Sequence, residues 1–220
     1  MISKRVLVGA AVLALTAAVT VPAVGAAPSR NNAGPSFVDM NDNGKYDKRT
    51  DITVDRLGGG INQEDGGRIV AGSALGTTFL LVANGHDLYL NRNVAGSNLV
   101  IVNRGGDINV APGVQITSSG TGFGLATRDR SGNAIAGSLN IGEGATVQHV
   151  YSGRSNRQVQ IEAADLTVGK DVDISSTSGA KKVGRTAAAQ TGMAHVKATH
   201  SLSIDESASI EGLQVIGPNS

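Results

Sequence analysis

The chain has 220 residues, enough for one domain with a substantial core or for two small domains. Hydrophobic residues make up 40% of the chain but aromatic residues only 3%, so any core must be built mainly from Val, Ile, Leu and Ala. The lack of cysteine excludes disulfide bonds, thiol catalysis and zinc–thiolate sites, and 30 glycines predict many tight turns.

The N-terminus predicts a secretory signal peptide over residues 1–26. Lys4 and Arg5 precede an uncharged stretch that ends before Pro22, and small residues then lead to Ala26. Only 16 residues separate Arg5 from Pro22, whereas a helix that spans a membrane needs about 20. We therefore expect cleavage after Ala26, a secreted chain located outside the cell or on its surface, and no membrane span in the mature protein.

The exported chain is predicted to be almost neutral. Two of the 19 basic residues lie in the signal peptide, so 17 remain against 18 acidic residues. A balanced charge of this kind gives no reason to expect a nucleic acid partner.

Residues 27–68 are predicted to be a flexible leader that contains a short acidic loop. Around Gly44, oxygen-bearing side chains alternate with other residues, as in loops that fold sharply around Ca2+ and supply it with oxygen ligands. The predicted ligands are Asp39, Asn41, Asn43, the carbonyl of Lys45, Asp47 and Asp51. The pattern resembles EF-hand-like and dockerin loops, but Thr50 stands where a bidentate carboxylate belongs, so we expect weak binding. The alternative is a solvated turn rich in Asp and Asn.

A repeat occupies the rest of the chain, from Ile69 to Ile216. Five segments share the order small acceptor, apolar, polar, apolar, at spacings of 20, 31, 27 and 36 residues. They are Asp87–Leu90, Asp107–Val110, Ser138–Ile141, Asp165–Val168 and Ser201–Ile204. Six residues before the first apolar position, Val82, Val102 and Val196 close a further strand. No helical periodicity interrupts these runs, so they predict short strands that stack in layers.

We therefore predict an all-β fold, a parallel β-solenoid of about five coils over residues 69–220, rather than a β-sandwich. Successive strands of a sandwich occupy different positions in the fold and therefore differ in sequence pattern. In stacked coils each strand returns to the same position, so the same pattern recurs. Two inward apolar ladders follow, one of Leu88, Ile108, Leu139, Leu166 and Leu202 and one of Leu90, Val110, Ile141, Val168 and Ile204. The pattern resembles right-handed parallel β-helix proteins, a group that includes pectate lyases, phage tailspikes and surface adhesins, although no catalytic motif accompanies it.

A column of short acceptors precedes the repeated strands, formed by Asp87, Asp107, Ser138, Asp165 and Ser201. The resemblance to lyases suggests a catalytic interpretation, because lyases of this fold use acidic clusters to hold calcium. A structural interpretation is simpler, since an acceptor before a strand satisfies a turn amide and recurs in every layer for that reason alone. We therefore assign no catalytic residue.

Three loops carry seven cations at one phase of the repeat. These are Arg128, Arg130, Arg154, Arg157, Lys181, Lys182 and Arg185. If the layers stack in register, the cations form a basic ridge that can hold an anionic polysaccharide or a cell-wall polymer. The alternative is that they keep an exposed sheet edge from aggregating.

Together these features predict a secreted, non-enzymatic structural or adhesive protein of a cell surface or extracellular matrix. We expect it to be stabilised by calcium, to bind anionic polysaccharide, and to self-associate through the ends of the solenoid. The alternative is a small polysaccharide lyase or glycoside hydrolase. Five coils make a cylinder of only roughly 24 Å, and the paired carboxylates of a glycosidase are not evident in the sequence.

Overall fold

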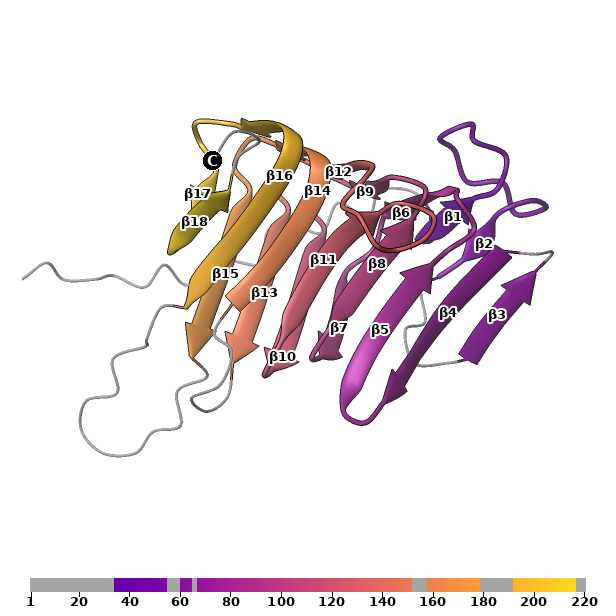
Figure 1. Cartoon of the computed structure of the whole chain (residues 1–220), viewed down its shortest axis with the longest axis horizontal. Helices are drawn as coiled ribbons and strands as arrows, with labels where there is room; N and C mark the ends of the chain where they lie inside the picture. The colour runs from indigo at the N-terminus through magenta and orange to yellow at the C-terminus, as the bar shows by residue number, and fades with distance from the viewer. Residues whose placement is uncertain (1–33, 55–59, 65–66, 152–157, 179–191, 217–220) are drawn as a thin grey trace, which may run out of the picture.

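The computed structural model describes residues 34–54, 60–64, 67–151, 158–178 and 192–216 (Figure 1). These residues form 18 strands and no helix. The strands are β1 Phe37–Asp39, β2 Ile52–Thr53, β3 Gly60–Glu64, β4 Gly67–Ala74, β5 Thr77–Val82, β6 Asp87–Leu90, β7 Val94–Ser97, β8 Val100–Arg104, β9 Ile108–Val110, β10 Gln115–Gly120, β11 Phe123–Arg128, β12 Ser138–Ile141, β13 Thr146–Tyr151, β14 Gln158–Val168, β15 Asp173–Ser178, β16 Met193–Ile204, β17 Ser209–Ile210 and β18 Leu213–Ile216.

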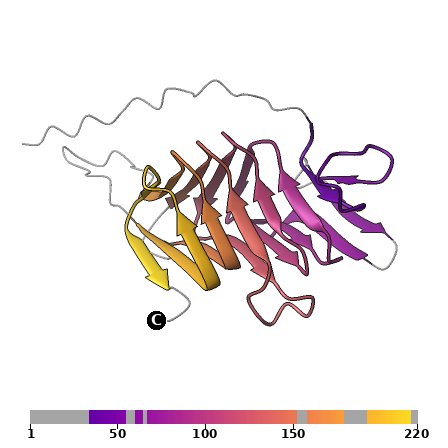
Figure 2. The same ribbon diagram turned by 90° about the horizontal axis from the view of Figure 1, so that it is seen from above.

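The strands form one large mixed sheet and one small parallel sheet. The large sheet has 13 strands in the order β2-β1-β6-β9-β12-β14-β11-β8-β5-β4-β3, and β16 pairs with β14 and with β18. It curls into a half-barrel. The small sheet has five strands in the order β17-β15-β13-β10-β7. In both views the layers follow one another along the long axis, from the N-terminal strands to the C-terminal ones (Figures 1 and 2).

Two long strands join the two halves of the large sheet. The beginning of β14 pairs with β11, whereas its end, from Asp165 to Val168, pairs with β12. Strand β16 follows β14 along both halves, with a register shift between Ala163 and Asp165. We call β3, β4, β5, β8, β11, β18 and the beginnings of β14 and β16 the first arm, and β1, β2, β6, β9, β12 and the ends of β14 and β16 the second arm. In each layer the chain passes through the first arm, the second arm and then the small sheet.

The repeated segments lie side by side in the second arm. Leu88, Ile108, Leu139, Leu166 and Leu202 are successive partners in parallel register. The first four are at most 1% exposed, and Leu202 is partly buried at the end of the row. At the other end, Leu88 pairs with Val38, and Val38 pairs with Ile52. One apolar column, which we call the leucine column, therefore runs from Ile52 to Leu202.

The inner faces of both sheets share one hydrophobic core. Val94, Ile116, Val147 and Ile174 of the small sheet belong to the same cluster of buried residues as the leucine column. All of these side chains are aliphatic, as the scarcity of aromatic residues requires. Burial of the alternating apolar residues of every layer is the main stabilising contribution to this fold.

The predicted architecture is wrong. The chain is neither a single parallel β-solenoid nor a right-handed parallel β-helix, because its large sheet is mixed and its parallel strands are divided between a half-barrel and a separate small sheet. The pairings of β3 with β4, β4 with β5, β1 with β2 and β1 with β6 are all antiparallel.

A tight hairpin explains part of this difference. Leu75 and Gly76 have φ angles of 51° and 75°, and they join β4 to β5 as a two-residue turn. Two successive left-handed residues match the twist of an antiparallel hairpin. Leu75 is fully exposed at this turn, where the chain reverses direction between β4 and β5.

The N-terminal strands cover the first layer of the second arm. Phe37 of β1 stacks on Tyr89 with ring centroids 4.9 Å apart and an interplanar angle of 8°, and Val38 is fully buried. The strands β1, β2 and β3 lie within the segment predicted to be a leader, and the predicted boundary after residue 68 falls inside β4. The predicted signal peptide lies outside the described residues.

Candidate functional sites

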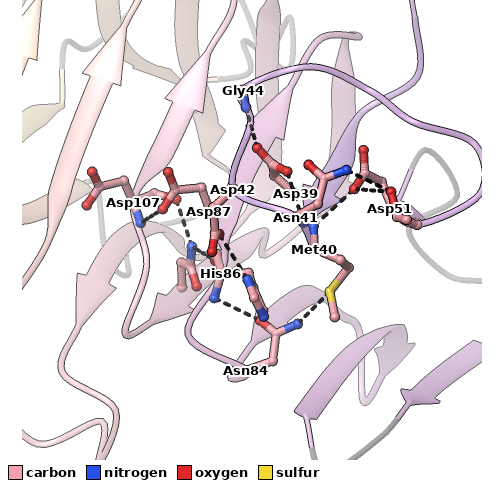
Figure 3. Close-up of polar contacts among 12 residues, drawn as sticks. Asp39, Met40, Asn41, Asp42, Gly44, Asp51, Asn84, His86, Asp87 and Asp107 are labelled. Atoms are coloured by element: carbon pink, nitrogen blue, oxygen red, sulfur yellow. Dashed lines mark hydrogen bonds and ion pairs between the residues drawn. The ribbon is translucent and has the colours of Figure 1, made fainter.

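The predicted calcium loop connects β1 to β2 at the N-terminal end of the second arm (Figure 3). Asp39 is 1% exposed, and its carboxylate accepts the main-chain N–H of Asn41 at 3.3 Å and of Gly44 at 2.6 Å. Gly44 has a φ of 73°, a conformation that glycine adopts without strain. The loop therefore turns sharply around the carboxylate of Asp39.

Asp51 closes the same loop from its other end. One oxygen of its buried carboxylate accepts the N–H of Met40 at 3.1 Å, and the other accepts the N–H of Asp47 at 2.6 Å. Asn43 and Asp47 each accept an N–H two residues further along the chain. The side-chain oxygens of these predicted ligands thus accept hydrogen bonds from main-chain amides of the loop itself.

The donor set has the oxygen chemistry that Ca2+ prefers, but its carboxylates are occupied by amides in this conformation. The amide of Asn41 donates to Thr50 at 2.9 Å, and Asp42 pairs with His86 at 3.0 Å. Across the described ranges, no three His, Asp or Glu side chains are grouped so that they could hold a metal ion. Calcium binding by this loop therefore stays a prediction from the motif.

The column of acceptors links one layer to the next. The carboxylate of Asp87 accepts the N–H of Asp107 at 2.8 Å (Figure 3). The carboxylate of Asp107 in turn accepts the N–H of Ser138 at 2.7 Å. Asp165 accepts the hydroxyl of Ser201 at 2.5 Å. These contacts support the structural interpretation of the column, because the three aspartates each accept a hydrogen bond from a neighbouring layer.

Environment separates the pKa values of two members of this column. Burial raises the pKa of Asp87 above its ordinary value of 3.8, and the nearby charges of Asp107, Asp42 and Asp39 add to the rise, while the hydrogen bond from Asp107 opposes it. Hydrogen bonds from Ser201 and His200 lower the pKa of Asp165. The charge of Asp87 therefore opposes folding at neutral pH, whereas that of Asp165 favours it.

Only the first loop of the predicted basic ridge lies in the described part of the chain. Arg128 ends β11 and forms an ion pair with Glu162 on β14, and it also donates to the carbonyl of Thr127 at 3.1 Å. Arg130 is exposed in the connection to β12. The other five cations, Arg154, Arg157, Lys181, Lys182 and Arg185, lie outside the described residues, so the ridge remains a prediction.

A groove runs along β11 on the outer face of the first arm. Three outward positions of this segment, Gly122, Gly124 and Ala126, carry almost no side chain, whereas Val100 stands on one side and Gln160 on the other. A Cβ atom placed on Gly124 would meet nothing closer than Val100, at 3.9 Å. The resulting cavity has a volume of about 310 Å³, at the lower limit for a small-molecule site.

The groove has an apolar floor and polar ends. Thr77 and Asn98 line it near the beginning of β8, and Arg128 and Glu162 line it near the end of β11. The side chains of Arg128 and Glu162 are 22% and 26% exposed, so their ion pair is partly shielded from water. Asn98 is held in place because its amide donates to the carbonyl of Gly76 at 2.7 Å and accepts the N–H of Thr121 at 2.6 Å.

Of the groove residues, only Arg128 was predicted from the sequence to be a binding residue, as part of the basic ridge, and Val102 was predicted only to close a strand. The prediction did not include Gly124, Ala126, Gln160 or Glu162. A signal was present, because small residues at positions i, i+2 and i+4 of a strand leave one face without side chains. That signal predicts a groove only when the flanking strands are known.

No family model, curated protein or solved structure matches the chain. The described part of the chain contains no helix that could cross a membrane.

Proposed function

We propose that the chain is a secreted, non-enzymatic structural or adhesive protein of a cell surface or extracellular matrix, which holds a saccharide chain in the groove along β11. The open groove is the observation that carries this proposal. The groove lies on a rigid part of the large sheet, because β11 is paired in register with β8 on one side and with β14 on the other.

The lining of the groove suits a neutral saccharide. Aliphatic side chains and glycine backbone present an apolar surface to the C–H faces of a sugar ring, while Gln160, Thr77 and the pair of Arg128 and Glu162 offer hydrogen bonds to its hydroxyl groups. The charges of Arg128 and Glu162 balance each other. A strongly anionic chain would therefore gain little in the groove itself and would need the predicted basic ridge.

The same lining favours binding over cleavage. Glycoside hydrolysis requires two carboxyl groups on either side of the scissile bond. Glu162 is the one carboxylate among the described residues that line the groove, and it is paired with Arg128. The alternative function, a polysaccharide lyase or glycoside hydrolase, has less support from this geometry.

The proposal is tested by filling the groove. Gly124→Val places a side chain in the open space, since its Cβ would meet nothing closer than Val100, at 3.9 Å, and valine suits a strand. We expect it to weaken the binding of neutral oligosaccharides, such as cello-oligosaccharides, by about tenfold or more in titration calorimetry, which corresponds to about 1.4 kcal/mol. Thr167→Val, on an exposed position of the second arm, is the matched control and should bind like the wild type.

Two further measurements separate the alternatives. Incubation with polygalacturonate, followed by ultraviolet absorbance for unsaturated products, tests for a lyase, and we expect no product. Binding of polygalacturonate that falls steeply with salt would support the basic ridge. Neutral oligosaccharide binding that is unchanged by Gly124→Val, or no binding by the wild type, would contradict the proposed role of the groove.

A further inference from the structure

The leucine column is incomplete at both ends. Its terminal members, Ile52 and Leu202, are only partly buried, whereas Leu166, one layer inside Leu202, is 1% exposed. The same holds elsewhere in the last layer. Ile204 and Ile210 are partly buried, and their inner neighbours Val168 and Ile174 are at most 1% exposed. Each end of the stack therefore leaves apolar surface that a further layer would cover.

The strands at both ends also have a free edge within the described part of the chain. At the C-terminal end, residues 201–204 of β16 pair with β14 alone, β17 pairs with β15 alone and β18 pairs with β16 alone. At the N-terminal end, β2 pairs with β1 alone and β3 pairs with β4 alone. Unpaired N–H and C=O groups along such edges are a template for another strand.

The directions of these edge strands match. Strand β2 is antiparallel to β1, which is antiparallel to β6, so β2 runs in the same direction as β6 and hence as the end of β16. Strand β3 likewise runs in the direction of β5, because β4 lies antiparallel between them, and hence in the direction of β18. A second chain displaced along the stack would thus extend both arms by parallel pairing, as between the inner layers.

We propose that the chain assembles with copies of itself from head to tail. The edge of β2 in one copy pairs with residues 201–204 of the next, and β3 pairs with β18. Ile52 of one copy then covers Leu202 of the other, so that the leucine column continues across the interface. The two faces of this contact differ, and each copy is displaced along the stack from the one before it. The contact therefore does not close into a ring, and a linear filament results.

The charges at the two ends favour this arrangement over contact between like ends. The C-terminal end exposes Asp205, Glu206 and Glu211, and two such ends would bring these carboxylates together. The N-terminal loop exposes cations, among them Lys48 and Arg49. Contact between like ends would also oppose the strand directions, whereas head-to-tail contact keeps them parallel.

Sedimentation velocity of the purified protein, from low to high micromolar concentration, tests the proposal. We expect the wild type to form a concentration-dependent series of oligomers. Leu202→Glu and Ile52→Glu each place a charge against apolar surface at one end, and each variant alone should be monomeric, with an apparent dissociation constant raised at least tenfold. An equimolar mixture of the two should form dimers only, because each variant retains the end that the other lacks. Thr167→Glu, on an exposed inner-layer position, should assemble like the wild type.

Hydrogen exchange of the wild type tests the same interface without a substitution. Amides of residues 52–53 and 201–204 should exchange more slowly at high concentration, at both ends together. A wild type that stays monomeric at every concentration would overturn the proposal. So would self-association of Leu202→Glu or of Ile52→Glu alone at wild-type strength, since either result means that like ends meet. Slower exchange at high concentration for the amides of one end only would also overturn the proposal.

Discussion

Truncation of Leu166 tests the core of this fold directly. Leu166 lies in the leucine column between Leu139 and Leu202 and is 1% exposed. Replacing a buried leucine by alanine costs about 2 to 5 kcal/mol, and the cost is largest where the surroundings cannot collapse into the cavity. Here parallel ladders hold the backbone on both sides of Leu166. We therefore expect about 3 to 5 kcal/mol for Leu166→Ala, in the upper half of that range.

Urea denaturation followed by circular dichroism measures this loss. Thermal unfolding gives a second measurement. For a domain of this size, 1 kcal/mol corresponds to a shift of roughly 2 to 4 °C in Tm, so Leu166→Ala should melt about 6 to 20 °C below the wild type. Thr167→Ala, at the next residue and exposed, should change the free energy of unfolding by no more than about 0.5 kcal/mol. If both variants unfold at the same urea concentration, the assignment of inner and outer faces in this arm is wrong.

Three further predictions concern the N-terminal loop and the acceptor column. Asp51→Asn should destabilise the fold by about 1 to 3 kcal/mol in the same urea titration, because both carboxylate oxygens of Asp51 accept a main-chain N–H. In the control, Asp47→Asn, one side-chain oxygen remains to accept the single N–H that Asp47 binds, so stability should change little. Asp87→Asn keeps the acceptor for Asp107 but removes a desolvated charge. Because the pKa of Asp87 is raised in the folded state, its charge destabilises the fold at pH values above that pKa. There the variant should be more stable than the wild type by less than about 1 kcal/mol, since the group is only half-buried. The difference should vanish in melting curves recorded below pH 3.8, where Asp87 is protonated in both states. Titration with millimolar Ca2+ should give heat with the wild type and none with Asp39→Ala, and equal traces would contradict the calcium motif.

The repeat predicted the leucine column because in-register stacking places equivalent residues on one another. The segments beginning at Asp87, Asp107, Ser138, Asp165 and Ser201 pair in register, since their short acceptors bond to the next layer and their alternating apolar residues face one core. The antiparallel strands before Asp87 could not be predicted in this way. Strand β4 has the same alternation as the later strands, and only the two-residue turn at Leu75 and Gly76 reverses the chain.

Counting residues back from each repeat failed where the corners differ in length. Val82 ends β5 as predicted, but Val102 and Val196 lie within β8 and β16. Val102 also faces outward, because Val82 is in register with Asn103. A buried Asn is acceptable at this corner since its amide donates to the carbonyls of His86 and Asp107 at 3.0 and 2.7 Å. Both acceptors are main-chain carbonyls of other residues, so the pattern of apolar residues alone could not predict that Asn103 faces the core.

The groove shows a second limit of sequence reasoning. Gly122, Gly124 and Ala126 are small and spaced like one face of a strand, yet this spacing alone also fits a face covered by large neighbouring side chains. The groove exists because Val100 and Gln160 flank Gly124 in register, and these residues lie in strands that are separated from β11 by turns of unequal length. A small residue on a sheet therefore identifies a candidate site only together with the register, which is a property of the folded layers and not of any single segment.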